Sequence, residues 1–157
     1  MDKVITSGLL IIGSIAAAIA LINAVIPAMS ESSAAMSAAN SAASERIRTD
    51  IEVVHVAALP VDNQIIIWVK NVGANNILPI ESSDIFLEMP GTVKQLSHGA
   101  GSGSEYWTYV IENGTEWTQG VTLKVTAHLS GGSVTPGSYT VTVSLFNAVS
   151  ATKDFSV

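Results

Sequence analysis

The sequence predicts an α+β protein in which a long N-terminal apolar helix precedes an antiparallel immunoglobulin-like β-sandwich. Two changes of pattern carry this prediction. No charged residue occurs over positions 4–30, and no glycine or proline interrupts positions 28–50. After Asp50 the chain runs instead in short segments rich in valine, isoleucine and threonine, separated by turn-forming residues. We therefore expect a hydrophobic helix over residues 1–49 and a β domain over residues 50–157.

The composition limits the classes of function. Of the 157 residues, 48% are hydrophobic and only 13% are charged, which indicates contact with a membrane. The seven basic residues are scattered and the formal net charge is −6, so nucleic acid is not an expected partner. The chain has no cysteine, which excludes disulfides, thiolate metal ligands and a thiol nucleophile.

The uncharged segment over residues 4–30 is long enough to cross a bilayer. At ~1.5 Å per residue it exceeds the ~30 Å apolar core of a membrane. Only Met1, Asp2 and Lys3 precede it, and this start does not match the basic beginning of a secretory signal peptide. We therefore expect the segment to remain in the working protein.

Small residues recur along the predicted helix at four-residue spacing, at Ala16, Ala20 and Ala24 and again within residues 34–43. Such faces let helix backbones approach closely inside a membrane or a bundle, although alanine also simply favours helix. A helix of this length would run ~70 Å, so something other than lipid must cover part of it. The residues predicted to pack against other helices are Leu9, Ile12, Ile15, Ala16, Ile19, Ala20, Ile22 and Ala24.

Pro27 lies inside the predicted helix. A proline there removes one backbone hydrogen bond and clashes with the preceding turn, so we expect a bend or a short melted stretch over residues 23–29. The sequence leaves open whether Pro27 is a functional hinge or a plain kink.

The β domain is predicted to contain about seven strands. One face of the sandwich core should carry Val121, Leu123 and Val125, and Trp68 is also placed in the core. Glycine-rich turns are expected at residues 99–103 and 131–132. The predicted strands are residues 51–59, 63–72, 84–89, 92–96, 105–112, 121–129 and 138–146.

Several segments together resemble the archaeal flagellin superfamily, including the archaellins and the archaellum accessory proteins F and G. The resemblance lies in the apolar helix, its serine- and alanine-rich continuation, the junction RIRTDIEVVHV, and the phrase IIIWVKNVG followed by PIESSDIFLE. It implies a type IV pilin-like helix joined to a β-sandwich. Members of this superfamily carry a basic leader ahead of the helix, so the sequence either begins at the mature end or is not processed in that manner.

The resemblance implies one of two structural functions. In the first, the chain is a subunit of an archaellum-like or pilus-like filament that serves motility or adhesion. Copies of the chain would leave the membrane with the help of an assembly machinery, and their helices would bundle in the filament core. In the alternative, the helix remains in the cytoplasmic membrane and the β domain stands outside the cell as a stator-type accessory protein that binds the surface layer.

No pattern in the sequence indicates an enzyme. His55, His98 and His128 are far apart and lie in predicted strands or beside them, and no nucleophile, metalloprotease or phosphate-loop motif is present. We expect neither a catalytic residue nor a cofactor.

Two smaller features each allow two interpretations. Glu81, Asp84 and Glu88 could supply oxygen ligands to Ca²⁺, or they could form a solvated strand edge that opposes pairing with other strands. The tripeptide Asn113-Gly114-Thr115 matches the acceptor for N-glycosylation and is also a hairpin-turn sequence, two readings that are compatible.

Overall fold

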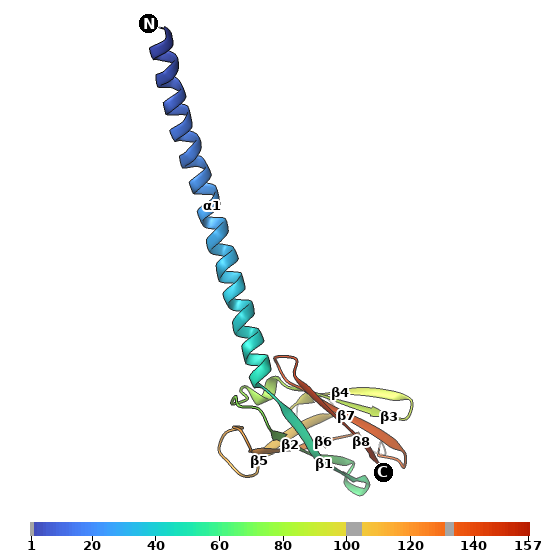
Figure 1. Cartoon of the computed structure of the whole chain (residues 1–157). Helices are drawn as coiled ribbons and strands as arrows, with labels where there is room; N and C mark the ends of the chain where they lie inside the picture. Colours follow the sequence, from blue (N-terminus) through green and yellow to red (C-terminus); the bar gives the residue numbers. More distant parts are fainter. Residues whose placement is uncertain (1, 100–104, 131–133) are drawn as a thin grey trace. The chain divides into compact units, whose positions relative to one another are not determined.

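The computed structural model describes residues 2–99, 105–130 and 134–157 (Figure 1). It contains two compact units, Met1–Ala43 and Ser44–Val157. The first unit is helical, and the second contains the last turn of the same helix together with all the strands. Most of the predicted turn at residues 99–103 and the turn at residues 131–132 lie outside the described residues.

The N-terminal helix α1 extends from Asp2 to Arg48, so the predicted continuous helix is confirmed. Every residue over the range 23–29 is helical, and the melted stretch that Pro27 could have produced does not form. A proline removes only its own backbone donor, and the hydrogen bonds of the flanking residues keep the helix continuous.

Over its described residues, the β domain is a nearly closed sandwich of eight strands in the order β1-β2-β6-β5-β4-β3-β7-β8. All neighbouring strands pair antiparallel except β4 and β5, which pair in parallel through two residue pairs. The strands are β1 (Ile51–Leu59), β2 (Gln64–Asn71), β3 (Asp84–Met89), β4 (Thr92–His98), β5 (Tyr106–Ile111), β6 (Thr122–His128), β7 (Ser138–Ser144) and β8 (Ser150–Ser156). Two single-turn 3₁₀ helices, η1 (Pro60–Asp62) and η2 (Ile80–Ser82), precede β2 and β3.

Strand β8 was not predicted. It pairs with β7 along its whole length, but its apolar alternation is interrupted because the exposed Lys153 lies at the alternate position between Ala151 and Phe155. Lys153 Nζ donates to the Val54 carbonyl at 3.0 Å, which links β8 to β1. Lys153 interrupts the alternation by which the strand could have been predicted, and the same residue helps to close the sandwich.

The core contains the predicted alternating face of β6. It also contains a second face from β7, formed by Tyr139, Val141 and Val143. The placement of Trp68 in the core is wrong. In β2 the residues Ile65, Ile67 and Val69 point inward, so period-two geometry places Trp68 on the outer face, where it is half-buried. The large aromatic residues of the core are instead Trp107, Trp117 and Tyr139.

Candidate functional site

The apolar surface of α1 is a candidate site of contact with lipid or with other helices. None of its described residues is buried, and Leu9, Ile12 and Ile19 each expose more than half of their surface. Among the described residues, α1 is the one helix long and apolar enough to cross a membrane, with a mean hydropathy of 2.6 over its most apolar window. All eight residues predicted to pack against other helices lie on this exposed surface.

Three hydroxyl side chains of the apolar segment, those of Thr6, Ser7 and Ser14, donate hydrogen bonds within the helix. Thr6 Oγ1 donates to the Asp2 carbonyl at 2.7 Å, and Ser14 Oγ donates to the Ile11 carbonyl at 2.8 Å. A hydroxyl satisfied in this way needs no water. These contacts therefore suit a helix that lies in lipid or against other helices.

The end of α1 is tied to the loop that follows β2. The last carbonyl groups of a helix lack partners within it. Here the Arg48 carbonyl accepts hydrogen bonds from the backbone N–H groups of Ala74 at 2.8 Å and Asn75 at 3.1 Å. The side chains of Asn75 and Thr49 both donate to the Glu45 carbonyl, at 3.3 and 2.8 Å. The loop, together with Thr49, thus supplies the missing donors.

Asn71 organises this loop from inside the domain. Its side chain is fully buried, and its Nδ2 donates to the carbonyls of Asn75 and Trp117, both at 2.8 Å. Its Oδ1 accepts a hydrogen bond from the backbone N–H of Gly73 at 3.0 Å. The phrase WVKNVG, which carries much of the sequence resemblance, therefore ends in the residues that fasten the β domain to the helix terminus.

The outer face of strands β1, β2, β6 and β5 carries aromatic and cationic side chains. His55 and Trp68 stand 5.5 Å apart between ring centroids, and Trp68 is in register with Lys124. Farther along the same face, the rings of Tyr106 and His128 stack at 4.4 Å. We call this surface the aromatic face.

The outer face of β3, β7 and β8 is chemically different, because it carries hydroxyl and carboxylate groups. Thr140 Oγ1 donates to Asp154 Oδ1 at 2.7 Å, and the hydroxyls of Thr142 and Thr152 lie 3.0 Å apart. We call this surface the hydroxyl face. Aromatic residues such as Trp68 and Tyr106 are enriched in protein interfaces, whereas acidic residues such as Asp154 are depleted there.

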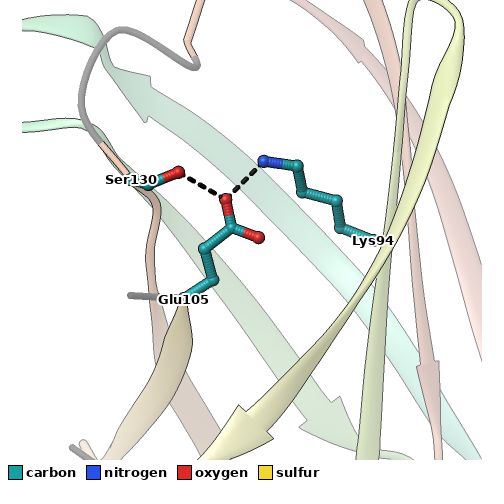
Figure 2. A network of polar contacts seen from close by, with 3 residues as sticks. All are labelled: Lys94, Glu105 and Ser130. Carbon is teal, nitrogen blue, oxygen red and sulfur yellow. Dashed lines mark hydrogen bonds and ion pairs between the residues drawn. The ribbon is translucent and has the colours of Figure 1, made fainter. Parts of the chain in front are cut away.

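A polar network lies where β4 and β5 pair in parallel (Figure 2). Glu105, just before β5, forms an ion pair with Lys94 of β4 and accepts a hydrogen bond from Ser130 Oγ at 2.7 Å. The hydrogen bond from Lys94 holds the pKa of the Glu105 carboxyl below its ordinary value, although partial burial acts in the opposite direction. Among the residues that the structure describes, two pairs join β4 to β5, so this side-chain network adds to a short ladder.

A second polar pair joins η2 to β5. The Tyr109 hydroxyl donates to Glu81, which lowers the pKa of the carboxyl and raises the pKa of the phenol. Sequence reasoning did not find this pair or the Lys94–Glu105 pair, because each joins residues that become neighbours only when the sandwich forms.

The three acids considered for Ca²⁺ do not form one site. Glu81 receives the Tyr109 hydroxyl, Asp84 accepts a hydrogen bond from Gln95 Nε2 at 3.0 Å, and Glu88 is exposed on β3. Over residues 2–99, 105–130 and 134–157, no group of three His, Cys, Asp or Glu residues is placed to hold a metal ion.

Each histidine ring packs against an aromatic ring. His55 contacts Trp68, His128 stacks on Tyr106, and His98 lies 4.7 Å from Trp107 between ring centroids. These contacts give the imidazoles a packing role on the surface of the sandwich.

The architecture defines a class of protein: a β-sandwich that follows a helix of membrane-spanning length and apolar character. No family model matches the sequence, and no curated protein matches it. Several solved structures share the fold, and two of them are archaellum proteins.

The archaellum periplasmic stator protein FlaG from Sulfolobus acidocaldarius superimposes with a TM-score of 0.59 at 19% identity, over 68% of this chain and 99% of that chain. The complex of the stator proteins FlaF and FlaG from the same organism gives a TM-score of 0.58 at 20% identity, over 68% and 89%. Helix α1 has 47 of the 157 residues, so the matched region must include most of the β domain. The predicted resemblance to the archaellum accessory proteins is thereby confirmed at the level of the fold.

Proposed function

We propose that this chain is a membrane-anchored, stator-type accessory protein of an archaellum motor, with α1 in the cytoplasmic membrane and the β domain outside the cell. One observation carries the proposal. The β domain shares its fold with archaellum periplasmic stator proteins, and the same chain has an exposed apolar helix long enough to span a bilayer.

Physical chemistry supports an anchor. Exposing the aliphatic side chains of residues 4–29 to water would cost ~25 cal/mol for each Å² of apolar surface, so the segment needs lipid or protein around it. A stationary part of a motor must also transmit force between its anchor and its outer domain. The hydrogen bonds from the loop after β2 to Glu45, Arg48 and Asp50 supply such a connection at the start of the β domain.

The finer part of the proposal is that the β domain binds the surface layer through its aromatic face. Aromatic side chains are enriched at protein interfaces, and Val110 on this face exposes 61% of its surface. The hydroxyl face supplies a matched comparison on the opposite sheet.

Fractionation of the cells tests the anchor. We expect the full chain to remain with the membrane after shearing and to require detergent for extraction. Protease added outside the cell, after the surface layer has been loosened, should digest the β domain and leave a fragment that contains residues 4–29. Recovery of intact chains in the sheared filament fraction would contradict the anchor.

Co-sedimentation with isolated surface layer tests the finer part, with the full chain held in lipid nanodiscs. Trp68→Ala should weaken binding at least tenfold, whereas Thr152→Ala on the hydroxyl face should leave it unchanged. Equal binding by the two variants would reject the aromatic face as the contact surface.

The filament subunit is a second candidate, favoured by the length of the helix. At ~1.5 Å per residue, the 47 residues of α1 extend ~70 Å, more than the ~30 Å that one bilayer crossing requires. If the helices bundle in a filament core, Ala20→Phe should abolish filaments, because a bulky ring would separate closely packed backbones. In the stator proposal this variant stays in the membrane as well as the parent chain does.

A further inference from the structure

The loop between β5 and β6 contains the one Asn-x-Ser/Thr tripeptide in the 157-residue sequence, Asn113-Gly114-Thr115. Asn113, Gly114 and Thr115 are all exposed, as are their neighbours Glu112 and Glu116. An enzyme that acts on a folded or folding chain could therefore reach the whole tripeptide.

The side chain of Asn113 is oriented by its oxygen. Asn113 Oδ1 accepts a hydrogen bond from the backbone N–H of Thr122 at 2.8 Å. A backbone N–H can only donate, so this contact assigns the oxygen and the nitrogen of the amide by chemistry. Nδ2, the atom to which a glycan would be attached, is left on the other side of the amide and is not needed for the hydrogen bond.

The surrounding loop is held in place by buried groups. Trp117, two positions beyond the tripeptide, is fully buried, and its carbonyl accepts hydrogen bonds from Asn71 Nδ2 at 2.8 Å and from the Ile77 backbone N–H at 3.2 Å. Glu116 Oε2 accepts a hydrogen bond from Asn76 Nδ2 at 2.9 Å. The exposed tripeptide is thus presented from an anchored loop, at the end of the domain where the chain enters from Arg48.

We propose that Asn113 is an N-glycosylation site whose glycan is compatible with the folded loop. The donor is a lipid-linked oligosaccharide. The bond between sugar carbon C1 and the lipid phosphate oxygen breaks as the bond from C1 to Asn113 Nδ2 forms. The amide loses one proton to a base of the transferase, and the lipid phosphate departs with the electron pair. The modified side chain keeps its carbonyl oxygen, so the hydrogen bond from Thr122 is retained.

This inference rests on the external location of the β domain in the proposed function. The protein should be isolated from cells in which a reference N-glycoprotein is modified, and its intact mass and the peptide that contains Asn113 measured by mass spectrometry. We expect a sugar mass increment on that peptide. Asn113→Asp should remove the increment while keeping an oxygen for the Thr122 hydrogen bond. Thr115→Val should also remove it, and Thr115→Ser should keep it.

A second acceptor tripeptide tests separately whether Asn113 is glycosylated and whether the β domain lies outside the cell. Pro90→Asn converts the exposed β3–β4 turn, Pro90-Gly91-Thr92, into another Asn-Gly-Thr tripeptide. Modification of this variant in that turn with Asn113 bare would overturn the inference and leave the external location intact. Absence of sugar from both positions would overturn both.

Discussion

Gly73 and Asp50 are joined where the chain leaves α1. The Gly73 backbone N–H donates to the Asp50 carbonyl at 3.0 Å, and a Cβ added at Gly73 would lie 2.4 Å from the Asp50 backbone nitrogen and 2.7 Å from the Arg48 carbonyl oxygen. The two backbones can approach this closely only because Gly73 has no side chain. The need for glycine at this position therefore arises from the junction between helix and sandwich.

Gly73→Ala should destabilise the β domain by about 1–3 kcal/mol, because the added methyl group must push two backbone segments apart. Urea unfolding of the full chain in detergent, followed by the fluorescence of the buried residues Trp107 and Trp117, would measure the change. Gly13→Ala is the matched control, since nothing lies within 4 Å of a Cβ at that position. Equal unfolding midpoints for the two variants would show that the junction can relax at no cost.

Asn71→Ala should destabilise the domain by about 1–3 kcal/mol, because it removes a buried amide that donates to the carbonyls of Asn75 and Trp117, of which the Trp117 carbonyl keeps its hydrogen bond from the Ile77 N–H. The same unfolding experiment applies. Asn76→Ala removes a single exposed hydrogen bond to Glu116 and should change the free energy of unfolding by less than ~0.5 kcal/mol. If the two variants unfolded alike, Asn71 would not organise the junction.

The helix and most strands could be predicted from the sequence because each rests on a local period. The uninterrupted run to Arg48 predicts a helix, and the alternation around Val125 predicts both a strand and its buried face. The segment around Trp68 is apolar at consecutive positions, so the sequence does not show which alternate residues face the core. Only pairing with β6, which places Trp68 opposite Lys124, decides which side faces outward.

The polar contacts could not be predicted for a different reason. Tyr109 and Glu81 are 28 positions apart, and Lys94 and Glu105 meet across the parallel seam between β4 and β5. Nothing in the sequence indicates that seam, because antiparallel neighbours are the expectation for short consecutive strands. The eight residues of α1 that are predicted to pack against other helices follow from spacing alone. Their role stays a prediction, because a single chain leaves that whole surface exposed.

The Lys94–Glu105 pair should make stability depend on pH at the acid end. The folded state lowers the pKa of Glu105 below its ordinary value of 4.5, so the stabilisation is present above that value and is lost as the pH falls through the folded pKa. Glu105→Gln should lower the free energy of unfolding at pH 7 by about 1 kcal/mol or less. The difference from the parent chain should shrink towards pH 3.

Urea titrations at several pH values between 3 and 7 would check this, with Glu88→Gln on the exposed part of β3 as the control. A difference between the parent chain and Glu105→Gln that stays constant over this range would mean that the pair does not titrate with folding.

A charged substitution in the middle of the apolar segment should weaken the insertion of helix α1 into the membrane. Ile15→Arg replaces a residue that favours insertion with one that opposes it, a change of about 3–4 kcal/mol at the centre of a spanning helix. Ile47→Arg makes the same replacement in the same helix, at a position that is 83% exposed and lies beyond the apolar segment, next to Arg48. We expect Ile15→Arg to shift the chain from the membrane pellet to the soluble or degraded fraction. Ile47→Arg should fractionate as the parent chain does, because its charge lies where α1 already carries arginines. Equal membrane retention of both variants would mean that residues 4–29 do not anchor this protein.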